Sequence, residues 1–230
     1  MPEITLYQFA GLEGLESGSP FCIKVHRALC AKGLEYSVQN VGSPGELKRI
    51  NPGKSKVPVL EYDGEMTVDS TRIIEVLEER HPAPPLLPAD AGARARVRLL
   101  EDWADEALYW FPVYLRWTDD ANYQVLYDSF FSKMPIPLRW FVPGIVRKGV
   151  IKQVRHQGIG LEDQATVLER LDGHCQMLET LLGDEKYLTG DAVTAADLAV
   201  FAPMHALRAE ITPQGREVIG RHQRLLQYLK

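Results

Sequence analysis

A chain of 230 residues is long enough for one large domain or two modest ones, and 45% hydrophobic with 25% charged residues suits a globular protein. The formal net charge of -5 argues against a nucleic-acid partner held by overall positive charge. No apolar stretch approaches the roughly 20 residues of a membrane-spanning helix, so a membrane partner is not expected. We expect no signal peptide, because the N-terminus lacks a basic start and an apolar block.

The three cysteines, Cys22, Cys30 and Cys175, are too few and too scattered for a disulfide framework. Cys22 and Cys30 are expected on one helix at a separation of about 12 Å, too far for a disulfide bond. A reducing, cytoplasmic location is therefore the default expectation. No metal site is expected, because His156 has no second ligand at metal spacing.

The first eighty residues alternate between strand and helix patterns. In order, we expect a strand at 3–9, a glycine-rich loop at 11–18, a helix at 20–32, strands at 36–41, 57–62 and 65–68, and a helix at 70–80. Asp63-Gly64, between the last two strands, is a strong hairpin signal. The predicted order is β-α-β, a variable stretch, then β-β-α.

Four prolines between His81 and Pro88 mark a domain boundary, because proline at this density forbids helix interiors and stiffens an extended connection. Beyond it the pattern is nearly all helical, at 91–117, 122–133, 143–156, 161–182, 194–208 and 213–229. We therefore predict an α/β domain at 1–82, a proline-rich linker at 83–90 and an all-helical domain at 91–230.

Ser19 stands directly before a proline at the start of the first helix. Its ordinary role there is that of an N-cap, whose oxygen accepts from a free backbone N–H. The same position also suits chemistry. A helix N-terminus carries partial positive charge that lowers the pKa of a nearby thiol, and a hydroxyl there can donate to the thiolate.

Two other places have both an ordinary and a functional interpretation. Pro58 is either a routine strand-start proline or, if its peptide bond is cis, a residue that turns the Val57 backbone outward to pair with an extended peptide. Asp69 and Ser70 are either common N-cap residues or, with the free N–H groups of the next helix, a site for a carboxylate. The aspartate can meanwhile attract an α-amino group.

The motifs SPFCIKVHRALCAKG from residue 19, NPGKSKVPVLEYDG from residue 51 and DSTRI from residue 69 precede the proline-rich linker. In this order they resemble the N-terminal half of glutathione S-transferases, especially the serine-using classes, over about residues 3–82. YLTGDAVTAADL at 187–198 resembles the helix-start signature of the C-terminal domain, in which Thr194 and Asp197 form a capping-box variant. The resemblance implies a thioredoxin-like N-terminal domain with a mixed four-stranded sheet and an all-α C-terminal bundle.

The resemblance implies that Ser19 activates the thiol of glutathione, the co-substrate. It also implies a set of glutathione-binding residues, Phe21, Lys56, Val57, Pro58, Asp69 and Ser70. Val57 holds the cysteinyl backbone in this scheme, and Lys56 reaches the glycyl carboxylate. Asp69 and Ser70 hold the γ-glutamyl end.

Two positions depart from the family pattern. Asp69 is one methylene shorter than the glutamate that many members have. Ser19 replaces the first cysteine of the CPFC motif of glutaredoxins and cysteine-using transferases, which leaves only Cys22, and a thiol one turn inside the helix is expected to be buried and inert. The implied activity is therefore conjugation of glutathione to a small apolar electrophile, rather than disulfide exchange through a protein cysteine.

The electrophile site is expected on the aromatic-rich helix at 91–117, with Tyr109, Trp110 and Tyr114 as candidates, although aromatic residues at helical spacing are more often simply core. The segment 119–160 is longer than in a compact transferase and loosely similar to metaxin and failed-axon-connection relatives. Its basic residues form either a solvated helix face or a surface for an anionic membrane or partner.

Two other functions stay open at this point. One is a glutathione-dependent reductase or peroxidase in which bound glutathione does the redox work. The other is a non-catalytic adaptor that keeps the fold and uses residues 119–160 to bind a partner or membrane. The family resemblance also implies a homodimer.

Overall fold

The computed structural model describes residues 2–132 and 134–230. Met1, in the predicted domain at 1–82, and Lys133, at the end of the predicted helix at 122–133, lie outside the described residues. The chain forms two compact units, Met1–Asp105 with Glu185–Ala202, and Glu106–Asp184 with Pro203–Lys230. Residues 83–90 hold no helix or strand and connect two helices of the first unit. The predicted boundary there stays a prediction.

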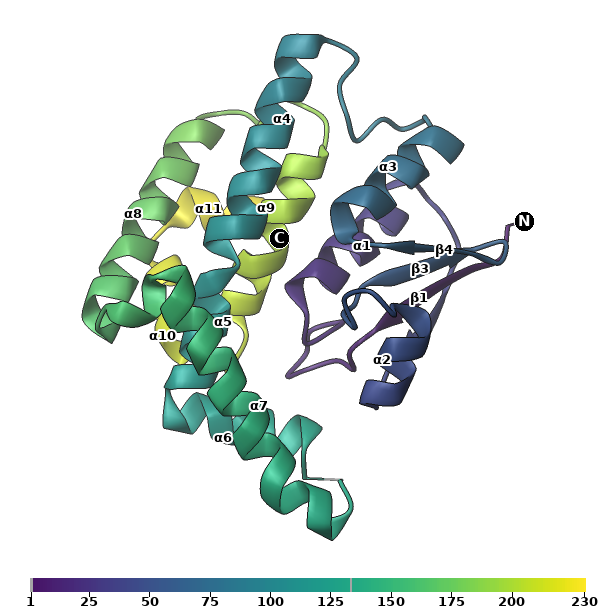
Figure 1. Ribbon diagram of the computed structural model, residues 1–230. Helices are drawn as coiled ribbons and strands as arrows, with labels where there is room; N and C mark the ends of the chain where they lie inside the picture. Colours follow the sequence, from purple (N-terminus) through teal and green to yellow (C-terminus); the bar gives the residue numbers. More distant parts are fainter. Residues whose placement is uncertain (1, 133) are drawn as a thin grey trace. The chain divides into compact units, whose positions relative to one another are not determined.

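The first unit contains a mixed four-stranded sheet of order β2-β1-β3-β4 (Figure 1). Its strands are β1 (Ile4–Gln8), β2 (Ser37–Asn40), β3 (Val59–Tyr62) and β4 (Glu65–Val68). β1 is parallel to β2 and antiparallel to β3, and β3 and β4 form a hairpin. Asp63 and Gly64 both have positive φ, as a two-residue hairpin turn requires. The predicted α/β class and sheet are confirmed.

Four helices belong to the first unit, α1 (Pro20–Ala31), α2 (Pro44–Ile50), α3 (Ser70–Arg80) and α4 (Ala91–Trp103). Helix α2 lies in the variable stretch between the predicted strands at 36–41 and 57–62, where the sequence pattern does not predict a helix. A local signal was present, because the Ser43 side chain accepts from the Glu46 N–H while the Glu46 carboxylate accepts from the Ser43 N–H. This reciprocal capping box begins the helix.

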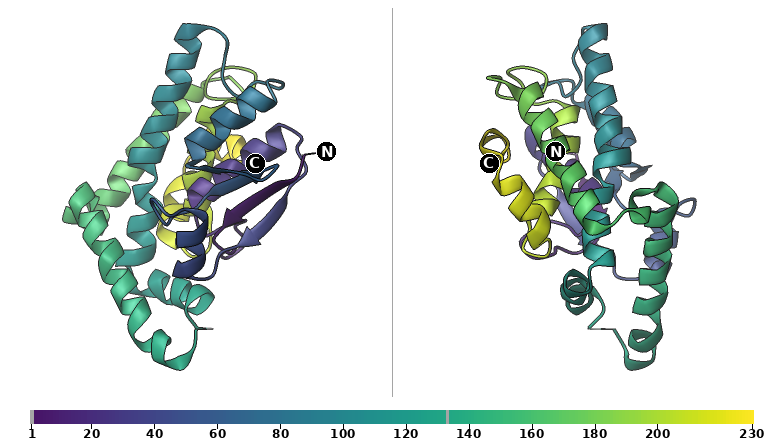
Figure 2. Two further views of the ribbon diagram at one scale, coloured as in Figure 1. Left: turned by 45° about the vertical axis from the view of Figure 1, so that its right-hand side comes forward. Right: turned by 90° about the vertical axis from the view of Figure 1, so that its left-hand side faces the viewer.

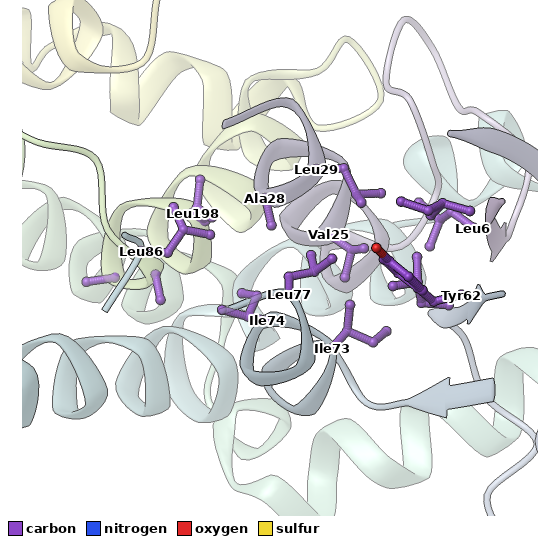
Figure 3. Close-up of a cluster of buried hydrophobic side chains, with 14 of the residues drawn as sticks. Leu6, Val25, Ala28, Leu29, Tyr62, Ile73, Ile74, Leu77, Leu86 and Leu198 are labelled. Atoms are coloured by element: carbon purple, nitrogen blue, oxygen red, sulfur yellow. The ribbon is translucent and has the colours of Figure 1, made fainter. Parts of the chain in front are cut away.

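One apolar core joins α1 and α3 to the sheet (Figure 3). The core includes Leu6, Val25, Leu29, Leu60, Ile73, Ile74 and Leu77. Leu86 and Leu198 extend it to the proline-rich segment and to the start of α9 (Ala195–Arg208). One half of the predicted capping-box variant of α9 is present, because Asp197 accepts from the Thr194 N–H at 2.8 Å.

A buried ionic network ties three helices of the first unit together. The Lys24 ammonium on α1 is 1% exposed and lies 2.7 Å from Glu101 and 2.6 Å from Asp105. Its third donor reaches the Thr71 hydroxyl on α3 at 3.2 Å, and that hydroxyl donates to Glu101. All three N–H donors of the ammonium are thereby used. Arg98 adds a second cation on the other oxygen of Glu101.

The second unit is helical, as predicted. It contains α5 (Trp110–Thr118), α6 (Asp120–Phe130), α7 (Ile136–Gln157), α8 (Gln164–Leu182), the end of α9, α10 (Pro213–Gly220) and α11 (Gln223–Tyr228). A π-helix at Ala104–Leu108 and a short 3-10 turn at Ile159–Leu161 complete the helical elements of the described residues. None of these helices combines the length and apolar character needed to cross a bilayer.

Three predicted helices differ from the structure. The segment 91–117 is α4, the π-helix and α5, rather than one regular helix. α7 begins at Ile136, seven residues before the predicted start, and holds Pro143 within it. The helix expected at 213–229 is broken, because Glu179 of α8 accepts from the Arg224 and Leu225 N–H groups and so caps α11 as a separate helix.

The Lys24 network gives a first prediction, that Lys24→Met lowers the free energy of unfolding by about 3 to 5 kcal/mol, because it leaves Glu101 and Asp105 buried without their cation. Urea unfolding followed by circular dichroism measures this loss. Lys186→Met, at an exposed lysine, is the matched control and is expected to stay near the wild-type value. A midpoint for Lys24→Met equal to that of the control contradicts the prediction.

A second prediction concerns pH. Burial raises the pKa of Asp105 to about 6, and the attraction of Lys24 offsets this only in part. The folded chain therefore holds this proton more tightly than the unfolded chain, whose aspartate pKa is about 3.9. The Asp105 contribution to stability is present below about pH 4 and is lost as the pH rises through about 6.

Because asparagine does not titrate, Asp105→Asn is expected to gain stability relative to wild type as the pH rises from 4 to 7, by up to about 3 kcal/mol. The pKa of Glu101 is held below its ordinary value, since Lys24 and Arg98 outweigh its burial, and this group is present in both proteins. Urea unfolding at four pH values measures the difference. A difference that is the same at every pH refutes the assignment.

Candidate functional site

Three predicted site segments meet at one edge of the sheet. The register pairs Tyr7 with Val59 and Val59 with Val68. The carboxyl end of β1, the amino end of β3 and the carboxyl end of β4 therefore share that edge. The loop to Ser19 leaves β1 there, Pro58 directly precedes β3, and Asp69 directly follows β4.

Packing agrees with this placement. Cys22, one turn into α1, lies in a buried cluster with Val57 and Val59, and Phe9 and Val68 pack against the same cluster. The structure thus brings the N-terminus of α1 close to the starts of β3 and α3. These are the three segments that the sequence motifs single out.

Ser19 occupies the N-cap position of α1 in an extended conformation, and Pro20 follows it. Its carbonyl accepts from the Cys22 and Ile23 N–H groups, and its own N–H donates to the Ser17 hydroxyl at 3.2 Å. Its side chain makes no capping hydrogen bond. The hydroxyl is therefore not used to begin the helix, and it lies half-buried beside the positive end of the helix dipole.

The Cys22 thiol is fully buried, as expected. Burial raises its pKa to about 11, and the hydroxyls of Ser19 and Ser17, which hydrogen-bond the sulfur, counteract only part of this rise. The thiol is neutral at physiological pH, and a neutral buried thiol is a poor nucleophile.

The loop before Ser19 is held by hydrogen bonds that the sequence analysis missed. The buried Ser17 hydroxyl donates to the Phe9 carbonyl at 2.8 Å, and the Gln8 amide donates to the Glu16 carbonyl at 2.9 Å. At Gly11 a side chain is excluded, because a Cβ would lie 2.7 Å from the Leu15 carbonyl oxygen. The position of Ser19 thus depends on a closely packed loop.

The Val57–Pro58 peptide is cis, the arrangement that the sequence analysis considered. No residue that the structure describes pairs with the Val57 main-chain N–H or C=O, and Val57 is free to pair with an added extended peptide. Lys56 is exposed, and its carbonyl accepts from the Asn51 side chain at 2.9 Å. Phe21 is half-buried on the first turn of α1.

Asp69 has a φ of 81°, a conformation rare outside glycine and enriched at functional sites. One of its carboxylate oxygens caps α3 by accepting from the Thr71 and Arg72 N–H groups. The other lies 3.6 Å from the ammonium of Lys54, an exposed ion pair that the sequence analysis did not anticipate. The Ser70 hydroxyl has no hydrogen-bond partner in the described part of the chain.

The electrophile-site candidates belong to the second unit. Tyr114 is buried, and its hydroxyl donates to the Glu162 carbonyl at 3.4 Å. Tyr109 and Trp110 are half-buried and form an edge-to-face pair with ring centroids 5.3 Å apart. Their assignment to an electrophile pocket stays a prediction. Across residues 2–132 and 134–230, no three His, Cys, Asp or Glu side chains are grouped to hold a metal ion.

Comparisons with known proteins extend these observations. The model of the glutathione S-transferase N-terminal domain matches residues 17–85, and the model of the glutathione S-transferase C-terminal domain matches residues 171–230. In structure, the chain is similar to a glutathione S-transferase from Rhodospirillum rubrum F11, with a TM-score of 0.64 at 23% identity over 95% of this chain and 86% of that one. It is also similar to rice GST1 in complex with glutathione, with a TM-score of 0.58 at 23% identity over 99% and 92% of the chains.

Among curated relatives, a probable maleylacetoacetate isomerase of Caenorhabditis elegans is 40% identical over 34% of this chain and 38% of its own length. The isoprene-epoxide glutathione S-transferase of Rhodococcus sp. strain AD45 is 27% identical over 87% of this chain and 85% of its own length. Failed axon connections of Drosophila melanogaster is 27% identical over 89% of this chain and 50% of its own length, in line with the resemblance of the middle segment.

The chain spans 38% to 52% of the length of the first relatives that it matches. The two family models nevertheless lie in the order expected along the chain, the first over the sheet-containing segment and the second over the C-terminal helices. The protein is a member of the glutathione S-transferase family.

Proposed function

We propose that the chain is a glutathione transferase in which the Ser19 hydroxyl stabilises the glutathione thiolate, which then attacks a small apolar electrophile. The observation that carries this proposal is the Ser19 side chain, which occupies a helix N-cap position without capping the helix. A hydroxyl there can donate to a ligand sulfur at the positive end of α1.

The energy required is modest. Lowering a thiol pKa from about 8.5 to below 7 takes roughly 2 kcal/mol of preferential thiolate stabilisation. One hydrogen bond to a charged acceptor contributes about 1.5 to 3 kcal/mol, and the helix terminus adds to it. The thiol proton leaves to solvent, and the Ser19 O–H donates to the sulfur anion. The sulfur forms the new bond to the electrophilic carbon while the carbon–halogen bond of an aryl halide breaks and halide leaves to solvent.

The other site residues hold the tripeptide. The unpaired Val57 main chain pairs with the cysteinyl backbone as an added strand, next to Pro58 and Phe21. The Ser70 hydroxyl and the N-terminus of α3 bind the γ-glutamyl carboxylate.

The two charged ends of glutathione have separate partners in this scheme. Lys56 is exposed and reaches the glycyl carboxylate. Asp69 attracts the α-amino group, which replaces Lys54 as the cation beside its outer carboxylate oxygen.

Three finer points of the proposal rest on family resemblance and composition. The apolar electrophile binds beside Tyr109, Trp110 and Tyr114, the protein works as a homodimer, and its location is cytoplasmic. Reduction by bound glutathione is the competing activity. A route through Cys22 is disfavoured, because its buried thiol has a pKa of about 11.

Ser19→Ala tests the proposal. The expected result is a fall in kcat/KM of about 10- to 100-fold for glutathione and an aryl halide, with a pH profile shifted to higher pH, because one charge-assisted hydrogen bond to the thiolate is lost. Ultraviolet absorbance of the bound thiolate across pH measures the thiol pKa directly. A parallel assay with a mixed disulfide shows whether reduction depends on the same residue.

Ser43→Ala is the matched control, because Ser43 also precedes a proline at a helix start but does cap its helix. It is expected to lose about 1 kcal/mol of stability and to keep the wild-type thiol pKa. Ser19→Ala is expected to lose less stability than this control. A wild-type pH profile in Ser19→Ala, or no glutathione binding by the folded chain in calorimetry, overturns the proposal, and the second result favours a non-catalytic adaptor.

A further inference from the structure

Helix α7 presents an unusual outer face, here called the α7 surface and defined by Leu138, Phe141, Ile145, Lys148, Lys152 and Arg155, all of them exposed. These residues follow one another at steps of three or four, so they form one stripe along the helix, about 25 Å long. On the opposite face Pro143 and Val154 are buried. Within the second unit, the α6–α7 hairpin extends away from α8 and α11 (Figures 1 and 2).

The first half of the α7 surface is apolar although it faces water. Phe141 is 67% exposed and Ile145 is 68% exposed, and Leu138 is 52% exposed. Trp140 and Ile136 add two more exposed apolar side chains at the same end of the helix. Leu138, Phe141 and Ile145 follow one another on one face, and exposed apolar groups that adjoin in this way mark interaction sites on soluble proteins.

The second half of the α7 surface is cationic. A groove of about 460 Å³ is lined by Lys148, Ile151, Lys152, Arg155, His156 and Leu161. The sequence has no acidic residue between Asp128 and Glu162, in a chain whose net charge is -5. In the part of the chain that the structure describes, the side chains of Lys148, Lys152 and Arg155 have no ion pair, whereas Arg147, on the inner side, is paired with Asp120 at 2.6 Å.

We propose that the α7 surface is a docking site for the surface of an anionic phospholipid bilayer. The apolar half enters the boundary between headgroups and acyl chains, and the cationic half binds the anionic headgroups. Trp140 lies at the apolar end, where an amphipathic ring suits the interface. The sequence pattern alone did not favour a membrane partner, and the exposure of these side chains changes that conclusion.

Charge favours a bilayer over a second copy of the chain. A two-fold contact centred on the α7 surface places the apolar half of one copy against the cationic half of the other, so Lys148, Lys152 and Arg155 would be buried without a negative partner. An anionic bilayer instead offers negative headgroups to the cationic half of the α7 surface and apolar chains to its apolar half. The inference does not depend on catalysis by Ser19, because the α7 surface lies wholly in the second unit.

Vesicle sedimentation with the full chain tests the proposal. The chain is expected to bind vesicles of phosphatidylglycerol and phosphatidylcholine, and to bind pure phosphatidylcholine vesicles at least tenfold more weakly. Raising the salt from 0.1 M to 1 M is expected to weaken binding to the anionic vesicles. Failure to bind anionic vesicles, or equal binding to both kinds, overturns the proposal.

Two variants separate the halves of the surface. Lys148→Gln with Lys152→Gln and Arg155→Gln is expected to weaken vesicle binding on the order of 100-fold, since each basic residue near an anionic surface contributes about a fivefold factor. The matched control, Lys48→Gln with Arg96→Gln and Lys186→Gln, removes three exposed charges elsewhere and is expected to bind as wild type. Equal loss in both triple variants means that net charge alone drives binding, which overturns the docking site.

Phe141→Ser with Ile145→Ser is expected to weaken binding at least tenfold while circular dichroism stays unchanged, because both side chains are exposed. Its control is Met177→Ser with Leu181→Ser, two exposed apolar residues of α8. If instead Phe141→Ser with Ile145→Ser changes the oligomeric mass and leaves vesicle binding untouched, the surface is a protein interface and the proposal fails.

Discussion

The candidate site depends on the ion pairs of the buried Lys24 ammonium. It lies on α1 little more than one turn beyond Ser19, and it binds Thr71, the residue after Ser70, on the first turn of α3. Its two carboxylate partners come from the end of α4 and the π-helix. A single buried cation therefore links the two helix N-termini of the candidate site. A buried ion pair contributes little net stability, but loss of one partner is costly.

Two helices of the first unit, α1 and α2, begin with a serine followed by a proline, but the two serine side chains have different roles. At α2, the Ser43 hydroxyl and the Glu46 carboxylate satisfy free N–H groups of the helix. At α1 the Ser19 hydroxyl makes no such bond, and Ser17 holds the Ser19 N–H instead. The loop thus leaves the Ser19 side chain at the positive end of the helix dipole, beside the Cys22 sulfur. In the free chain the Ser19 hydroxyl hydrogen-bonds the Cys22 sulfur, and in the proposed function it donates to a ligand thiolate at the same helix end.

Much of this fold and site could be predicted from the sequence, because the signals are local. Short β-prone runs predict the strands, and Asp63-Gly64 predicts the hairpin. The motifs at Ser19, Val57 and Asp69 fall at one sheet edge once the strand order is known. The missed features depend on contacts distant in sequence. Glu179 caps the start of α11 across more than forty residues, and Lys24 pairs with Asp105 across eighty-one. The helix α2 was missed despite a local capping signal.

The α7 surface shows a different limit of sequence patterns. Its inner face carries Pro143 and Val154, and its outer face carries Phe141 and Ile145, so apolar residues occur on both sides and no single apolar stripe stands out along the helix. Only the side-chain exposure in the folded chain separates the two sets. Covering a core does not account for the exposed Phe141 and Trp140, which share the helix with lysines that have no ion pair among the described residues. Large apolar side chains that stay exposed mark an interaction site, and the cations next to them make an apolar, anionic surface the partner that complements them.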